Sequence, residues 1–332
     1  MTVKNPFIPP RYLRNPHIQS ILNSLGPRKI RAKRLIRVLD SESLILTTEE
    51  GVRLGAEFDV ATATKAPRKN ALVILLHGWE GSSKSAYQVT TAAWLLDHGF
   101  DVLRLNLRDH GETQHLNRDI FNSTMTSEVA DAIAVFLIDH EYPAVFLAGF
   151  SLGGSFTLRI AADYGDTLGL TAVVAISPPV DPNTSMNAID NTLIIYEKYF
   201  FYRWTKSLRK KLVHFPEHNF GAELDQAKTL DDMNVTFINR FTPFPDAKSY
   251  FSAYALTGDR LKALTIPAHL IASIDDPIIP IADIEKINRP ASLKIDIQRY
   301  GGHCGFITNL AANSWIELRL VEILDEYLVS NG

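Results

Sequence analysis

Runs of mostly hydrophobic residues recur along this chain, separated by segments long enough for helices. After residue 70 these runs lie at 71–76, 101–106, 144–148, 170–177, 268–272 and 293–297. Continuous apolar runs of this kind are typical of strands buried on both faces of a parallel sheet. The segments at about 84–98, at about 125–140 and from Ser151 to about 164 predict helices between them. Strands that alternate with helices predict an α/β protein with a doubly wound, mostly parallel sheet.

The first 70 residues follow a different pattern. Residues 1–30 are rich in proline and basic groups. Because proline fixes φ and lacks an N–H donor, they predict an extended arm that leads to a short helix at about 16–24. Apolar residues in the arm predict that it packs against the core, but we find no chemistry in it. Short alternating runs at 34–39, 44–48 and 52–58 predict an antiparallel meander.

The alternation of strands and helices stops at residues 182–264, which hold a large share of the aromatic side chains. We expect one domain over residues 1–332, in which this segment is a helical insertion. Ligands of open α/β sheets bind at the carboxyl ends of the strands, so the insertion is expected to form a cap over that edge. For most of the individual aromatic residues, the simpler interpretation is packing on the core.

One helix predicted within the insertion is amphipathic and basic. Phe201, Trp204, Leu208 and Leu212 recur at helical spacing. Its basic residues are spread over the remaining surface and are Arg203, Lys206, Arg209, Lys210 and Lys211. Such a helix forms either a solvated face or a peripheral contact with an anionic membrane, and we expect the solvated face.

Composition excludes several classes of protein. A net charge of −3 and a pI near 6.4 give no basic surface for nucleic acid. The single cysteine, Cys304, excludes an intrachain disulfide framework. No apolar run approaches the roughly 18 residues that span a bilayer, and the opening residues lack the apolar region of a signal peptide. We therefore expect a cytoplasmic protein.

A serine flanked by glycines follows the run at 144–148. In 149–153, Gly149 and Gly153 leave room for a nucleophile, Ser151, on a sharp turn from a strand to a helix. The same turn places Ser151 near a helix N-terminus, which favours the negative charge that develops during acyl transfer. Because the motif also fits a glycine-rich connection with an ordinary serine, its interpretation depends on the rest of the chain.

A serine nucleophile needs a base within hydrogen-bond reach and a carboxylate that orients this base. Asp275 and Asp276 come directly after the run at 268–272, and the turn pattern favours Asp276, with Asp275 as the second candidate. A carboxylate in such a turn can instead serve as its cap. His303 lies in a glycine-rich loop after the last run. The chain order Ser151, Asp276, His303 is that of the α/β-hydrolase fold, so we predict these three residues as a catalytic triad.

The negative oxygen of an acyl-transfer intermediate requires two backbone donors. We expect the N–H of Leu152, directly after the nucleophile, and the N–H of Trp79, in the loop after the first buried strand. His77 in the same loop is interpreted as shaping the loop, with no part in proton transfer. The other histidines lack the spacing of a metal site, so we expect neither a metal nor another cofactor.

These features predict a serine hydrolase that cleaves carboxylic esters, with a small acyl ester or lipid as substrate. An acyltransferase with the same triad is an alternative within the enzymes. A hydrolase fold without catalytic activity, serving as a binding module, is an alternative of another class. The filled triad positions argue against the binding module.

Several motifs together resemble one known family. They lie at 9–22, 77–82, 106–111, 149–154, 275–277 and 301–306, and together they are similar to the YheT-like branch of the α/β-hydrolase superfamily. The resemblance extends from about residue 6 to the end of the chain. It implies Ser151, Asp276 and His303 as the triad and esterase, lipase or acyltransferase activity. Members differ in substrate, which includes medium-chain esters and phospholipids.

Overall fold

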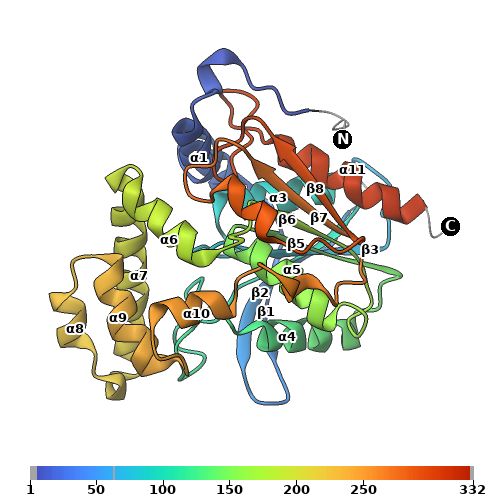
Figure 1. Ribbon diagram of the computed structural model, residues 1–332. Helices are drawn as coiled ribbons and strands as arrows, with labels where there is room; N and C mark the ends of the chain where they lie inside the picture. The colour runs from blue at the N-terminus through green and yellow to red at the C-terminus, as the bar shows by residue number, and fades with distance from the viewer. Residues whose placement is uncertain (1–5, 63, 330–332) are drawn as a thin grey trace.

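The computed structural model describes residues 6–62 and 64–329, and in this part of the chain eight strands form one sheet (Figure 1). The strands are β1 (Glu42–Thr47), β2 (Arg53–Asp59), β3 (Ala71–Leu76), β4 (Asp101–Leu105), β5 (Ala144–Phe150), β6 (Leu170–Ile176), β7 (Ala268–Ser273) and β8 (Leu293–Gln298). Their order across the sheet is β1-β2-β4-β3-β5-β6-β7-β8. β2 is antiparallel to β1 and to β4, and the remaining neighbours are parallel. The predicted mostly parallel α/β sheet with antiparallel N-terminal strands is confirmed.

Helices precede, connect and follow these strands. They are α1 (Pro16–Ser24), α2 (Pro27–Ile36), α3 (Ala86–Asp97), α4 (Thr126–Asp139), α5 (Leu152–Tyr164), α6 (Pro182–Asn191), α7 (Ile194–His214), α8 (Gly221–Gln226), α9 (Leu230–Phe241), α10 (Ala247–Ala253) and α11 (Trp315–Val329). Short 3₁₀ helices lie at Arg11–Leu13, Pro216–His218, Asp259–Leu261 and Ile281–Lys286. The helices predicted at 84–98, 125–140 and up to 164 correspond to α3, α4 and α5.

Two layers of helices cover the sheet. Residues 71, 73 and 75 of β3 lie in one hydrophobic cluster with side chains of α3 and α11. Residues 72, 74 and 76 lie in another cluster with side chains of α4 and α5. Because successive side chains of a strand point to opposite faces, an entirely apolar strand requires a cover on both sides. All six side chains of β3 are fully buried, as the run at 71–76 predicts.

The prediction of a strand at 34–39 is wrong. Residues 27–36 form helix α2, which begins at Pro27 after a glycine with positive φ. The buried positions of α2 are Arg28 and Ala32, one helical turn apart. Arg28 Nη2 lies 2.7 Å from Glu317 Oε1 in α11, an ion pair between residues that are 289 positions apart. The alternating residues at 34–39 therefore begin within the end of a helix. This helix is held by Glu317, a partner that the local sequence cannot reveal. The other two runs form the predicted antiparallel pair, β1 and β2.

The N-terminal arm packs against the domain. Residues 1–5 of the predicted arm lie outside the described residues. Phe7 is buried against Phe306 and Trp315, with ring centroids 5.6 and 5.9 Å away. The predicted short helix is confirmed as α1, whose first turn is capped by the side chain of Asn15.

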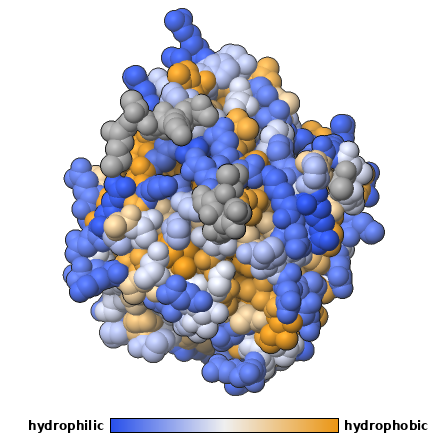
Figure 2. Space-filling view, turned by 90° about the vertical axis from the view of Figure 1, so that its right-hand side faces the viewer, coloured by the Kyte–Doolittle hydropathy of each residue, from blue (hydrophilic) through white to orange (hydrophobic). Residues whose placement is uncertain are grey.

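Helices α6 to α10 follow β6 and precede β7, and they stand beside the sheet on the left of Figure 1. Helix α11 lies on the opposite side. Figure 2 shows that opposite side of the molecule, where hydrophilic and hydrophobic residues are interspersed. Among the described residues, no helix is both long and apolar enough to cross a membrane.

Candidate active site

Ser151 lies on a sharp turn between β5 and α5. Its backbone has φ 53° and ψ −122°, an unusual conformation for a residue with a side chain. A Cβ on Gly149 would lie 2.2 Å from the carbonyl oxygen of Gly153, and a Cβ on Gly153 would lie 2.5 Å from that of Leu76. Both positions therefore require glycine, because strand β5, helix α5 and strand β3 approach so closely that no side chain fits.

The structure brings the three predicted triad residues together. His303 Nε2 lies 2.9 Å from Ser151 Oγ, and His303 Nδ1 lies 2.9 Å from Asp276 Oδ2. These distances allow the imidazole to accept the proton of the serine while its other nitrogen donates to the carboxylate. The three side chains come from the ends of β5, β7 and β8, so the parallel sheet places them at one edge.

Asp276 is held by its own turn. Its Oδ1 accepts hydrogen bonds from the N–H groups of Ile278 and Ile279, at 2.8 and 2.9 Å. Its side chain is only 2% exposed. One carboxylate oxygen therefore fixes the turn, which leaves the other directed at His303.

Asp275 contacts a different part of the same loop. Its Oδ1 accepts a hydrogen bond from the N–H of Gly302 at 2.9 Å, while Oδ2 is buried without a hydrogen-bond partner. Burial raises the pKa of this carboxyl above its usual value, although the bond from Gly302 acts in the other direction. The geometry thus directs Asp276 to the imidazole of His303, and Asp275 to the backbone of its loop.

Two opposing effects act on the imidazole. Burial by itself lowers the pKa of His303. The negative charge of Asp276 and its hydrogen bond raise this pKa, with a further contribution from Cys304, and together they hold it well above its ordinary value. The site is therefore arranged to stabilise the imidazolium that forms when the ring takes up a proton.

The loop after β3 approaches Ser151 closely. A Cβ on Gly78 would lie 3.1 Å from the Cβ of Ser151 and 3.7 Å from its Oγ. The phenol oxygen of Tyr87 accepts the N–H of Gly78 at 2.9 Å, which fixes this loop. Trp79, the next residue, lines the same pocket as Ser151. Leu152 is the first residue of α5, and an N–H in that position has no acceptor within the helix.

His77 is buried beneath the same loop. Burial, followed by the proximity of His110, lowers the pKa of His77 well below its ordinary value. Its Nε2 accepts the N–H of Leu107 at 3.1 Å, and its Nδ1 lies 2.7 Å from the carbonyl oxygen of Gly78. A neutral ring that joins two loops fits the interpretation of His77 as a residue that shapes the loop.

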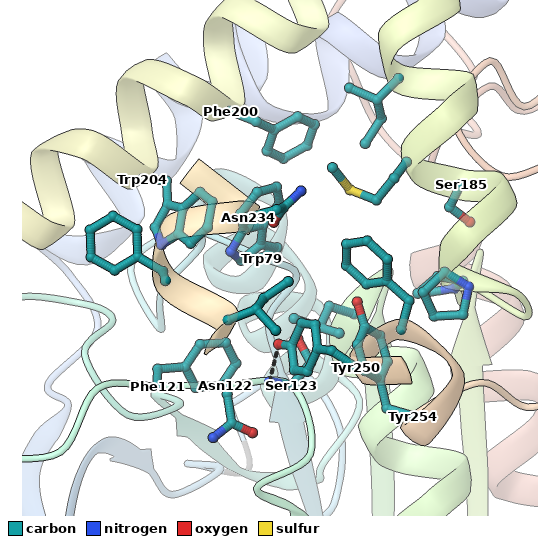
Figure 3. Close-up of a pocket in the computed structure, with 18 of the residues that line it drawn as sticks. Trp79, Phe121, Asn122, Ser123, Ser185, Phe200, Trp204, Asn234, Tyr250 and Tyr254 are labelled. Atoms are coloured by element: carbon teal, nitrogen blue, oxygen red, sulfur yellow. Dashed lines mark hydrogen bonds between the residues drawn. The ribbon is translucent and has the colours of Figure 1, made fainter. Parts of the chain in front are cut away.

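A predominantly apolar pocket of about 110 Å³ opens beside Ser151 (Figure 3). The core and the inserted helices both contribute to its wall, and its lining includes Trp79, Phe121, Ser151, Leu152, Met186, Ile189, Phe200, Trp204, Phe237, Tyr250, Tyr254 and Ile279. Trp79 stacks on Phe200 of α7, with ring centroids 5.1 Å apart, and meets Trp204 edge-on at 5.5 Å. Several of the insertion's aromatic residues thus line a cavity, and two of them pack on Trp79, the residue predicted to provide an oxyanion donor.

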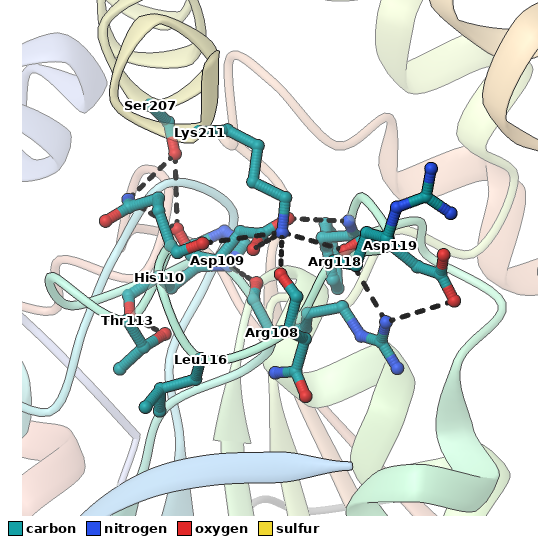
Figure 4. A network of polar contacts seen from close by, with 12 residues as sticks. Arg108, Asp109, His110, Thr113, Leu116, Arg118, Asp119, Ser207 and Lys211 are labelled. Carbon is teal, nitrogen blue, oxygen red and sulfur yellow. Dashed lines mark hydrogen bonds and ion pairs between the residues drawn. The ribbon is translucent and has the colours of Figure 1, made fainter. Parts of the chain in front are cut away.

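The basic residues of helix α7 are predicted to lie on a solvated face, and for Lys211 this prediction is wrong. Only 1% of its side chain is exposed, and Nζ lies 2.8 Å from Asp109 Oδ1 (Figure 4). The same nitrogen donates to the carbonyl oxygens of Asn117 and Asp119. Arg203 of α7 also points inward and donates to the carbonyl oxygen of Glu80 at 2.5 Å. Lys210 pairs with Glu112, so three of the five basic residues bind α7 to loops of the core that are distant in sequence.

The sequence alone gave no role to two residues that contact this site. Ser20 in α1 accepts a hydrogen bond from the N–H of His303 at 2.8 Å, although the arm showed no candidate chemistry. Tyr87 in α3 fixes the loop at Gly78. The contact of Ser20 joins residues 283 positions apart, so no spacing of residues could have indicated it. Tyr87 lies only nine positions after Gly78, but a lone tyrosine in a helix carries no signal of this contact. In the described part of the chain, no group of three or more His, Cys, Asp or Glu side chains could hold a metal ion.

Comparison with known proteins identifies the class of protein that this fold and site define. The chain belongs to the α/β-hydrolase family, whose model matches residues 73–312.

Individual relatives agree with the YheT-like resemblance, which is confirmed. "Putative esterase YheT" of Escherichia coli (strain K12) is 25% identical over 97% of this chain and 94% of its own length. An "Abhydrolase domain-containing protein" of Dictyostelium discoideum is 27% identical over 100% of this chain and 84% of its own length.

Solved structures share the fold. An esterase of Pyrococcus furiosus superposes with a TM-score of 0.57 at 16% identity, covering 98% of this chain and 100% of its own. The 2,6-dihydroxy-pseudo-oxynicotine hydrolase gives a TM-score of 0.58 at 17% identity, covering 92% of this chain and 74% of its own. At these identities the likeness concerns the fold alone.

Proposed function

We propose that this protein is a serine hydrolase of carboxylic esters, with a medium-chain or lipid-like acyl ester as substrate. The observation that carries the proposal is the continuous chain of hydrogen-bonding distances from Ser151 Oγ through His303 to Asp276, beside an apolar pocket. Membership of the α/β-hydrolase family and the esterase description that YheT carries agree with it.

In the first half of the reaction, His303 Nε2 removes the proton of Ser151 as Oγ attacks the acyl carbonyl carbon. The carbonyl oxygen becomes negative and accepts hydrogen bonds from the N–H groups of Leu152 and Trp79. Asp276 stabilises the imidazolium and keeps its Nδ1 directed inward. His303 then gives its proton to the leaving alkoxide, which departs as an alcohol and leaves an acyl-enzyme.

In the second half, water takes the place of the alcohol. His303 Nε2 removes a proton from this water as its oxygen attacks the acyl carbonyl. Collapse of the second intermediate breaks the bond to Ser151 Oγ, and His303 returns the proton to that oxygen. The products are a carboxylic acid and the free enzyme, so the cycle needs no cofactor.

The pocket supports an acyl chain as the group that is bound. We propose that helices α6 to α10 form a cap within a single domain, since α6, α7 and α9 supply much of the pocket's apolar wall. Each methylene that moves from water into an apolar pocket contributes about 0.8 kcal/mol, which corresponds to about a fourfold increase in kcat/KM. A chain that fills the pocket is therefore favoured over acetate.

A fluorophosphonate probe tests the nucleophile. We expect the probe to label the folded wild-type protein at Ser151, the Ser151→Ala variant not at all, and the His303→Ala variant far more slowly. His98→Ala is the matched control, because His98 contacts the Trp94 carbonyl oxygen in α3 and lies outside the site. An unlabelled wild-type protein, or equal labelling of His303→Ala and wild type, contradicts the proposal and favours a binding module without activity.

A series of p-nitrophenyl esters of increasing chain length tests the substrate class. We expect kcat/KM to rise from acetate to medium chains and then to level off or fall when the chain exceeds the pocket. A profile that is flat or greatest for acetate contradicts the acyl pocket while leaving the nucleophile intact. Adding a primary alcohol separates hydrolysis from acyl transfer, because an acyltransferase forms the new ester in preference to the acid.

A further inference from the structure

Helix α1 of the N-terminal arm lies directly against the loop that carries His303. The hydroxyl of Ser20 donates to the carbonyl oxygen of Pro16 at 2.8 Å, which leaves a lone pair to accept the N–H of His303 at 2.8 Å. The hydroxyl has one proton and two acceptor sites, so it can make both bonds at once. Ser20 therefore holds the backbone of the proposed base itself.

A second residue of α1 fixes the same loop further along. Gln19 is fully buried, and its side chain both donates to the carbonyl oxygen of Ile307 and accepts the N–H of that residue. A Cβ on Gly302 would lie 2.3 Å from the carbonyl oxygen of Pro16, and one on Gly305 would lie 2.4 Å from that of Gln19. The two glycines thus allow the loop to pack against the backbone of α1 without a gap.

The conformation of this loop requires such support. Gly302 and Cys304, on either side of His303, both have positive φ, and for a residue with a side chain this conformation is unfavourable. The other side chains that hold the loop form hydrogen bonds with the neighbours of His303. Asp275 and Ser273 bond Gly302, and Ser177 contacts the N–H of Cys304 at 3.3 Å. Among these side chains, Ser20 is the one that accepts the N–H of His303, while Ser273 bonds the carbonyl oxygen of the same peptide group.

Helix α1 also contacts the inserted helix α7, through His17, which lies on the same helix face as Ser20. His17 Nδ1 lies 3.0 Å from the hydroxyl of Tyr196, and their ring centroids are 5.7 Å apart. Tyr196 is buried against Ile278 and Ile279, whose N–H groups fix Asp276. Helix α1 thus contacts both the loop of the proposed base and the helix that lines the acyl pocket.

We propose that the N-terminal arm is a working part of the catalytic centre, in which Ser20 is a positioning residue that holds His303 within reach of Ser151 and Asp276. This inference rests on the proposed function, since it concerns the base of that reaction. Without the hydroxyl, the N–H of His303 has no acceptor in α1, and the loop can relax away from the serine. A displacement of about 1 Å in a reacting group lowers the rate by about 100-fold.

The test compares Ser20→Ala, Ser20→Thr and wild type with a medium-chain p-nitrophenyl ester. We expect kcat of Ser20→Ala to fall by about 10- to 100-fold with little change in KM, because the substrate pocket is not altered. Ser20→Thr keeps the hydroxyl and restores kcat. In Ser20→Ala the midpoint of the kcat/KM pH profile moves to lower pH, because the imidazole is less closely paired with Asp276. A residue that served stability alone would not shift this midpoint.

Ser292→Ala is the matched control, since Ser292 also bonds a distant backbone carbonyl, that of Leu264, outside the site. If Ser20→Ala does not fold, Ser20→Cys takes its place, because a thiol has a similar size but is a weak acceptor.

The outcomes separate the two proposals. A Ser20→Ala variant that reacts with the fluorophosphonate at the wild-type rate, or that loses no more kcat than Ser292→Ala, overturns this inference and leaves the proposed function standing. A wild-type protein in which the probe does not label Ser151 refutes the proposed function itself.

Discussion

Asp275 and Asp276 are adjacent in the chain and bond two adjacent residues of one loop, one through its backbone and the other through its side chain. Asp276 Oδ2 lies 2.9 Å from the ring nitrogen of His303, whereas Asp275 Oδ1 accepts the backbone N–H of Gly302 at 2.9 Å. One carboxylate thus orients the imidazole, and the other helps to hold the loop that carries it.

This relationship predicts unequal effects of the same substitution. In Asp276→Asn the amide presents a donor to Nδ1, which favours the tautomer whose Nε2 carries the proton and cannot accept that of Ser151. We expect kcat to fall by about 10⁴-fold. Asp275→Asn keeps an oxygen for Gly302, and we expect it to retain most of the activity. Steady-state kinetics of the two purified variants decide between these roles, and a larger loss in Asp275→Asn would reverse our assignment.

The environment of His303 predicts how activity depends on pH. The ring must be neutral to accept a proton, so kcat/KM rises as pH rises through its pKa. Burial lowers this pKa, but Asp276 and Cys304 together raise it by more, so we expect the midpoint above the ordinary histidine value of about 6.5. In Asp276→Asn, where burial acts without the carboxylate, the midpoint of the residual activity should lie lower. A pH profile from 5 to 10 measures both, and an unchanged midpoint would contradict the attribution to Asp276.

The ion pair of Lys211 and Asp109 predicts a large effect on stability. Burial raises the pKa of Asp109 and lowers that of Lys211, and each charge is stabilised by the other. Removing one partner leaves the other charge buried and unpaired, so Lys211→Met should lower the free energy of unfolding by about 3–5 kcal/mol. The second substitution, Asp109→Asn in the same chain, should restore part of this loss. Equilibrium urea unfolding of the wild type, the single variant and the double variant measures both changes.

The control for this prediction lies on the same helix. Arg209 pairs with Asp225, and both side chains are more than half exposed. Because solvent screens such a pair, Arg209→Ala should change the free energy of unfolding by less than about 1 kcal/mol. Equal losses in Arg209→Ala and Lys211→Met would show that burial of Lys211 does not determine the effect.

The buried carboxyl group of Glu80 should make the free energy of unfolding depend on pH. Burial raises the pKa of this carboxyl from 4.5 to about 7, with Arg203 acting to lower it and Asp109 to raise it. Between these pH values the native state binds more protons than the unfolded state, so this group makes stability fall as pH rises. The decrease amounts to about 3 kcal/mol, at about 1.4 kcal/mol per pKa unit. Glu80→Gln should remove this part of the dependence in urea unfolding at pH 5 and pH 8. The exposed Glu141→Gln serves as control, and an unchanged slope in Glu80→Gln would refute the prediction.

The sequence by itself determined the architecture and the candidates for the site. Apolar runs such as 71–76 predict buried parallel strands wherever they occur, because burial on both faces demands such a run. The glycines around Ser151 predict the sharp turn, since no side chain fits there. The order of Ser151, an aspartate and His303 along the chain then follows from the connectivity of the fold.

Only the tertiary structure decided the contacts that depend on distant segments. The pairing of Arg28 with Glu317 holds the helix α2 where local alternation predicted a strand. Lys211 faces the core because Asp109 and three loop carbonyls surround its ammonium group. The contact of Ser20 with His303, 283 positions further along, had no signature in either segment. Local patterns of side chains predict elements because each element buries its own face, whereas an ion pair or a hydrogen bond between elements depends on how the whole chain packs.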